Sequence, residues 1–169
     1  MPHRKERRVF DKGHHRKFLV VIDETPEMEA ALVFAAARVN RGGGALELLY
    51  VIEPQDFQHW IGVREVQREE ETNKAKAIFR LFKRKLNNHG FGHIVVEEVI
   101  REGKTAEQVI EQIESDEDIA ILILGASGSQ KGPGPLVTAL ATGSLAGNFP
   151  IPVTIVPGTL TPDEIKLLA

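Results

Sequence analysis

Short apolar runs alternate along this chain with longer segments that have helical periodicity. Runs that are apolar on both faces predict strands buried on both sides of a parallel sheet, whereas apolar residues three or four positions apart predict helices. The third run mixes polar and apolar residues, so we expect it near an edge of the sheet. The five runs cover residues 18–22, 45–52, 93–100, 119–124 and 153–156.

Helical segments separate these runs. The first is predicted to begin with Thr25 as N-cap and Pro26 as first helical residue, and to end at the glycines 42–44. Thr105 and Gln108 have the spacing of a capping box at the start of another helix. Two more helices are predicted, at 63–88 and 136–147, together with a short terminal helix after Thr161.

This alternation predicts an α/β fold with a single doubly wound parallel sheet of five strands, in the order 3-2-1-4-5, and helices on both faces. The 169 residues suit one domain, which we expect over residues 18–158, between a basic tail at 1–17 and a C-terminal tail or short helix at 159–169. No apolar run has the roughly 18–20 residues that a membrane helix needs, so no membrane association is expected. The absence of cysteine fits a cytoplasmic location.

Charge is distributed unevenly. The chain carries −3 overall, yet residues 1–17 hold seven Lys and Arg against Glu6 and Asp11, so the body is acidic. An acidic body argues against nucleic acid as a partner. The basic tail could contact phosphate or acidic lipid, but we favour the interpretation that it is solvated, partly disordered and dispensable for folding.

A glycine turn follows the run 119–124 and is the first candidate for chemistry. Glycines at the end of a buried strand let backbone amides approach a phosphate, although two glycines often make only a strand-to-helix turn; we leave both interpretations open. Lys131 could add a cation. The candidate residues in this region are Gly125, Ser127, Gly128, Ser129, Gly132 and Gly134.

Asp23 ends the first strand. In the predicted order the first and fourth strands are neighbours, so Asp23 and Gly125 share one edge of the sheet, at the point where the winding direction changes. The Asp23 carboxylate could accept hydrogen bonds from a ribose or a base. It could equally cap the following helix or form a salt bridge.

Other motifs are excluded by their spacing. Gly103-Lys104-Thr105 resembles the end of a P-loop, but Glu98 stands where that motif requires glycine. The six histidines show no metal-ligand spacing, so no metal site is expected. No nucleophile elbow occurs, and we assign no catalytic residue.

Four segments of the chain resemble the universal stress protein family, over residues 16–158. They are FLVVIDET, LLYVIEP, ILILGASG and FPIPVTIVPG. The resemblance implies a five-stranded parallel α/β fold related to the adenine nucleotide α-hydrolases. It also implies a cytoplasmic dimer, in a family that contains both ATP binders and members that bind none.

The family's ATP-binding motif, G-x2-G-x9-G-[ST], is matched in part. Gly125 and Gly128 match its first two glycines, but Thr138 and Ala139 stand where the motif has Gly-Ser. The resemblance further implies that Asp23 is the family aspartate after strand one and that Val51 is the adenine contact. With Gly132 and Gly134 as replacement amide donors, these residues and Ser127, Ser129 and Thr138 form the implied nucleotide site.

We therefore expect a cytosolic stress-response protein that binds an adenine nucleotide (ATP, ADP or AMP) without efficient turnover, with Mg²⁺ only alongside a nucleotide. An alternative is a dimeric interaction or regulatory module that binds no nucleotide, its cleft filled by residues 131–135. A slow ATPase is a third possibility. The fifth strand, 153–156, is an uncharged sheet edge and should join two chains in a homodimer, with Phe57, Trp60 and Ile61 as the alternative interface.

Overall fold

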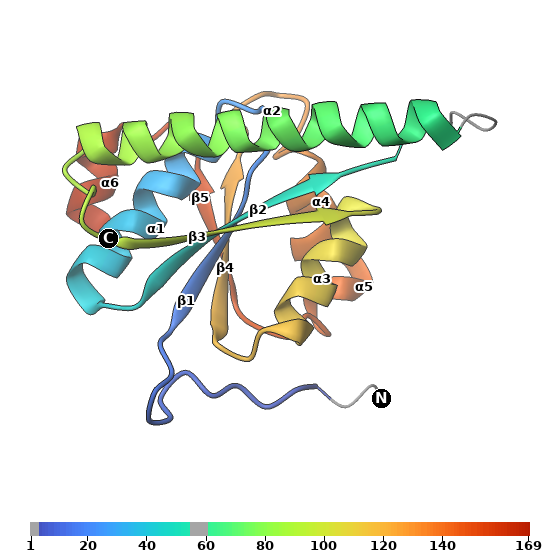
Figure 1. Ribbon diagram of the computed structural model, residues 1–169. Coiled ribbons are helices and arrows are strands. Elements are labelled where there is room, and N and C mark those ends of the chain that lie inside the picture. Colours follow the sequence, from blue (N-terminus) through green and yellow to red (C-terminus); the bar gives the residue numbers. More distant parts are fainter. Residues whose placement is uncertain (1–3, 55–60) are drawn as a thin grey trace.

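The computed structural model describes residues 4–54 and 61–169, and its centre is a sheet of five parallel strands (Figure 1). The strand order is β3-β2-β1-β4-β5, which confirms the predicted fold class and topology. The third strand begins and ends two residues later than predicted. The strands are β1 (Lys17–Val21), β2 (Ala45–Ile52), β3 (Val95–Glu102), β4 (Ile119–Ala126) and β5 (Val153–Pro157).

Helices cover both faces of the sheet because the strand residues alternate between two apolar clusters. Phe18 and Val20 pack toward α1 (Met28–Gly42), α2 (Ile61–Asn88) and α6 (Pro162–Leu168). Leu19 and Val21 pack on the opposite face, toward α3 (Thr105–Ser115) and α4 (Pro135–Ala141). A four-residue helix, α5 (Gly143–Ala146), follows α4, so the single helix predicted at 136–147 is divided in two. No helix in the described ranges is long and apolar enough to cross a membrane.

Two helices begin differently from the prediction, and the terminal helix begins as predicted. The predicted capping box at Thr105 is wrong: both the amide and the hydroxyl of Thr105 donate to the Glu53 carboxylate, at 3.0 and 2.7 Å. The first helix begins at Met28 with Glu27 as N-cap, later than predicted. The terminal helix is confirmed, and its capping box between Thr161 and Glu164 is complete.

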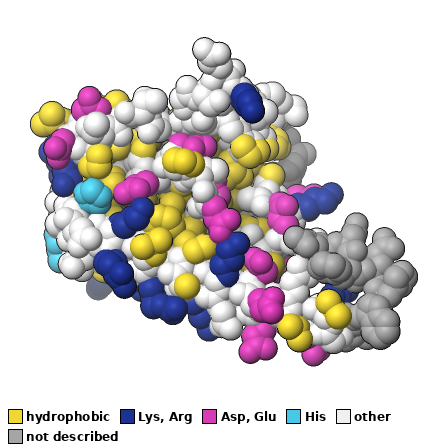
Figure 2. All heavy atoms as spheres, turned by 90° about the horizontal axis from the view of Figure 1, so that it is seen from above, with side chains coloured by type: hydrophobic (Ala, Val, Ile, Leu, Met, Phe, Trp, Pro, Cys, Tyr) yellow, Lys and Arg dark blue, Asp and Glu magenta, His cyan; other side chains and the backbone are white. Residues whose placement is uncertain are grey.

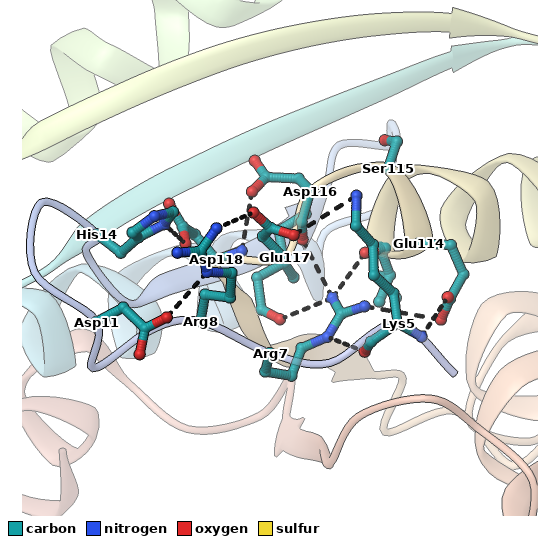
Figure 3. Close-up of polar contacts among 12 residues, drawn as sticks. Lys5, Arg7, Arg8, Asp11, His14, Glu114, Ser115, Asp116, Glu117 and Asp118 are labelled. Atoms are coloured by element: carbon teal, nitrogen blue, oxygen red, sulfur yellow. Dashed lines mark hydrogen bonds and ion pairs between the residues drawn. The ribbon is translucent and has the colours of Figure 1, made fainter. Parts of the chain in front are cut away.

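The N-terminal tail contacts the body of the domain through a few side chains, so it is not wholly solvated as expected, although most of its described residues are exposed (Figure 3). Arg7 lies against the C-terminal end of α3, and its side chain is only 19% exposed. Its guanidinium donates to the carbonyl oxygens of Ile113 at 2.7 Å, Asp116 at 3.1 Å and Ile119 at 3.4 Å. Arg7 thus pairs the Ile113 carbonyl, which belongs to the last turn of α3, and links it to the turn that leads into β4.

Ion pairs extend this attachment on either side of Arg7, and we refer to residues 5–14 as the N-terminal clasp. Arg8 lies 3.6 Å from Glu117, and its amide donates to the Glu117 carbonyl oxygen. His14 Nδ1 lies 2.7 Å from an oxygen of Asp118. The basic tail therefore covers the acidic turn between α3 and β4 (Figure 3).

A partly buried charged cluster lies where the strands begin, next to the clasp. The Lys17 ammonium lies 2.7 Å from both Asp116 and Glu97, and 3.9 Å from Glu47, which is only 2% exposed. Burial raises the pKa of Glu47 to about 7, and the charge of Asp116 adds to this effect while Lys17 opposes it. Burial lowers the pKa of Lys17, but the hydrogen bonds to Asp116 and Glu97 outweigh it and raise that pKa overall. Lys17 is thus the counter-ion of the carboxylates of Glu47, Glu97 and Asp116.

Surface charges of both signs are mixed on the face seen from above in Figure 2, with hydrophobic side chains between them.

Candidate functional site

A narrow cleft lies between the C-terminal ends of β1 and β4, where the sequence predicted a site. Asp23, Thr25 and Glu27 line one side of the cleft, and Gly125 and residues 133–137 line the other. Its free volume is about 20 Å³, which is room for about one water molecule. The structure therefore brings Asp23 and Gly125 together, and the segment after β4 fills most of the space between them.

Asp23 has a structural role in this cleft. Its Oδ1 accepts hydrogen bonds from both the amide and the hydroxyl of Thr25, the amide at 3.0 Å. This arrangement fixes the turn that leads into α1. Oδ2 accepts no hydrogen bond from the described residues and remains available to a ligand.

Gly125 and Gly128 are required for close packing. A Cβ at Gly125 would lie 2.0 Å from the carbonyl oxygen of Glu27, and one at Gly128 would lie 2.5 Å from Cγ2 of Thr159. The first contact brings the start of α1 onto β4, and the second brings the turn after β4 against the segment after β5. Close packing accounts for glycine at both positions without a ligand.

An open recess of about 590 Å³ adjoins the cleft. Ser127, Ser129, Lys131 and Thr138 line it, together with Gly132 and Gly134, which have φ angles of 110° and 108°. The recess is wide open to solvent, in contrast to the enclosed clefts that bury most of a small ligand. The predicted phosphate-binding residues other than Gly125 and Gly128 thus lie together around one recess.

The loop that borders the recess uses several of its own amides. The Ser127 amide donates to the Pro133 carbonyl oxygen at 2.9 Å, and the Gly132 amide donates to the Ser129 carbonyl oxygen at 3.2 Å. The amides of Ser129 and Lys131 donate to the hydroxyl oxygens of Ser127 and Ser129, both at 3.2 Å. Neither serine hydroxyl donates a hydrogen bond to residues 4–54 or 61–169, and Lys131 is exposed.

Val51 and Thr138 differ from the other predicted site residues. Val51 lies in β2, half-buried against the α3 side of the sheet, and lines neither the cleft nor the recess. Thr138 lines the recess, but its hydroxyl donates to the Gly134 carbonyl oxygen at 2.9 Å.

Glu27 was not predicted, although it lines both the cleft and the recess. The sequence indicates only that Glu27 lies in the first turn of a helix. Its central position depends on Gly125, Gly134 and Gly158, which are far away in the sequence.

A family model identifies the class of protein that this fold and cleft define. The universal stress protein family model matches residues 14–157, and the chain belongs to that family. No curated protein matches the sequence.

Solved structures share the fold. One is the hypothetical protein MJ0577, the subject of a structure-based assignment of biochemical function. It is 18% identical to this chain, with a TM-score of 0.67 over 86% of this chain and 98% of its own length. A universal stress protein in complex with cAMP is 15% identical, with a TM-score of 0.58 over 85% and 98%. A family member from Arabidopsis thaliana with AMP bound is also 15% identical, with a TM-score of 0.52 over 84% and 91%. At these identities the likeness shows the fold.

Proposed function

We propose that this chain is a nucleotide-binding universal stress protein that holds an adenine nucleotide at the edge formed by β1 and β4, without efficient turnover. The observation that carries the proposal is the continuous surface from Asp23 and Gly125 in the cleft to Ser127, Ser129 and Lys131 in the recess. Such a position, outside the carboxyl ends of the strands at a switch point, is where open α/β sheets bind ligands. The cAMP and AMP complexes of proteins with the same fold support the choice of ligand.

Each part of the nucleotide has partners of suitable chemistry on this surface. Oδ2 of Asp23 would accept a hydrogen bond from a ribose hydroxyl or an exocyclic amine. The free hydroxyl hydrogens of Ser127 and Ser129, and the Lys131 ammonium, would donate to phosphate oxygens. Mg²⁺ would enter only with the nucleotide.

The base requires space that the cleft does not contain in this conformation. With about 20 Å³ free, Pro133 and Gly134 must move away from Asp23 before an adenine can enter. This requirement favours a second candidate function, an interaction module that binds no nucleotide because residues 131–135 fill its cleft.

Calorimetry on the full chain separates the two functions. AMP should release heat on binding, and Lys131→Ala should weaken binding about fivefold, since it removes one charge-assisted hydrogen bond to phosphate. Lys76→Ala, on the exposed surface of α2, is the matched control and should change nothing. Absence of heat with millimolar AMP, ADP and ATP would leave the interaction module as the function.

We also propose that the protein acts in the cytoplasm as a homodimer joined along β5. This strand is at the edge of the sheet, so one row of its backbone groups has no partner strand within the described sheet. Ile155 on this strand is 42% exposed. The alternative interface involves Phe57 and Trp60, which lie outside the described residues.

A further inference from the structure

Glu27 lies where the cleft meets the recess, and its carboxylate faces the space that a phosphate would enter. Its Oε1 lies 3.5 Å from the position that a Cβ would have on Gly134. The main chain of Glu27 packs closely on β4 and on the loop after β5: a Cβ at Gly125 would lie 2.0 Å from its carbonyl oxygen, and one at Gly158 would lie 2.6 Å from its Cβ. This packing places the root of the side chain beside the candidate site.

This carboxylate has no partner in the described part of the chain. It accepts no hydrogen bond and lies within ion-pair distance of no Lys, Arg or His among residues 4–54 and 61–169. The neighbouring acidic residues differ: Glu24 pairs with Lys74 at 2.9 Å, and Glu29 pairs with Lys85 at 2.9 Å. A half-buried carboxylate without an ion pair adds no such pair to the fold and repels an anionic ligand beside it.

Lys131 is the cation among the residues that line the recess, and Glu27 balances it. The charges of Glu27 and Lys131 thus cancel in the recess, and Asp23 in the adjoining cleft makes the whole site negative. A triphosphate site concentrates positive charge and free amide donors. In this loop, by contrast, four amides already donate hydrogen bonds to acceptors of the loop itself. Each phosphate added to the nucleotide increases repulsion by Glu27 without gaining a second cation.

We propose that Glu27 determines which nucleotide the site accepts: it selects adenine nucleotides with a single phosphate, such as AMP or a cyclic monophosphate, and rejects ATP. This inference rests on the proposed nucleotide site and specifies its ligand. The selection is electrostatic, so it should depend on the charge of the phosphate chain and not on the base.

The experiment compares the wild-type chain with Glu27→Gln, which keeps the size of the side chain and removes its charge. Kd is measured by calorimetry for cAMP, AMP and ATP in buffer with EDTA. Wild type should bind AMP and cAMP more tightly than ATP. Glu27→Gln should strengthen ATP binding about tenfold and cAMP binding about twofold, because the triphosphate carries more negative charge close to the carboxylate. Glu24→Gln, with the same charge change on the same loop, should alter each Kd by less than about twofold.

The outcomes separate this inference from the proposed function. If wild type and Glu27→Gln both bind AMP but the variant gains no preference for ATP, the inference is wrong and the nucleotide site stands. If neither protein binds any of the three nucleotides, the proposed function itself fails. In a second arm with Mg²⁺, the advantage of Glu27→Gln for ATP should shrink, since the cation neutralises part of the charge. If Mg²⁺ makes wild type the tighter ATP binder, Glu27 holds a metal and the inference is overturned.

Discussion

Replacing Arg7 with alanine should destabilise the whole domain, although Arg7 belongs to a tail that composition alone describes as dispensable. The side chain donates to the carbonyl oxygens of Ile113 and Asp116 at 2.7 and 3.1 Å, and more weakly to that of Ile119 at 3.4 Å. A hydrogen bond from a charged donor contributes about 1.5–3 kcal/mol. Water can reach these carbonyls once the side chain is gone, so we expect a loss of about 2 kcal/mol in the free energy of unfolding.

For a domain of this size, such a loss lowers Tm by about 4–8 °C. Thermal unfolding followed by circular dichroism, with urea unfolding as a second measure, determines the loss. Lys12→Ala is the control, because Lys12 is exposed and forms no ion pair or hydrogen bond in the described part of the tail. Its Tm should match that of wild type.

High salt distinguishes the contacts within the clasp. The exposed ion pairs of Lys5 and Arg8 with Glu117 are weak and screened, whereas hydrogen bonds to backbone carbonyls persist. The effect of Arg7→Ala should therefore remain in about 1 M salt. A Tm within about 2 °C of the Lys12→Ala protein would refute the reasoning and restore the solvated tail.

Two further predictions concern the buried charge and the sheet edge. Because the folded-state pKa of Glu47 is about 7, well above its unfolded value of 4.5, the stability it contributes is complete below pH 4.5 and is lost as pH rises through 7. In urea unfolding, the free energy of unfolding of Glu47→Gln should therefore rise by about 2 kcal/mol relative to that of wild type between pH 5 and pH 8. The exposed control Glu107→Gln should follow wild type. Parallel pH curves for Glu47→Gln and wild type would contradict this prediction. Sedimentation equilibrium of wild type should give twice the 18.7 kDa mass of one chain. Ile155→Lys should reduce the mass to that of one chain, whereas the control Leu167→Lys on α6 should leave the dimer intact. A wild-type mass of one chain would exclude the dimer.

The strands and their order could be predicted because they depend on local patterns. Runs such as 119–124 are apolar on both faces and have one stable environment, the interior of a parallel sheet. Once the order 3-2-1-4-5 is given, Asp23 and Gly125 must meet at one edge, as the structure shows. This part of the site follows from topology.

The features that the sequence did not predict depend on contacts between residues that are distant in the sequence. Glu53 caps the helix at Thr105, 52 positions away, in place of the local capping box. The clasp joins Arg7 to Ile113, and no periodicity in a short polar tail indicates such a contact. Glu27 became part of the site because glycines of β4 and of the loops after β4 and β5 allow α1 to approach closely. The local sequence specifies each element and the capping box at Thr161, but the cap at Thr105 and the charges at the site are specified by tertiary packing.

Amide chemical shifts recorded during a titration with AMP test the central claim most directly. In the assigned ¹⁵N spectrum of the full chain, AMP should move the amide resonances of Asp23, Glu27, Gly125 and the non-proline residues of 127–138. The resonances around Lys17, at the opposite end of the strands, should stay unchanged. Pro133 and Gly134 must be displaced for the base to enter, so Gly134 should show the largest shift. Shifts confined to other surfaces, or none at millimolar AMP, would contradict a nucleotide site at the edge between β1 and β4.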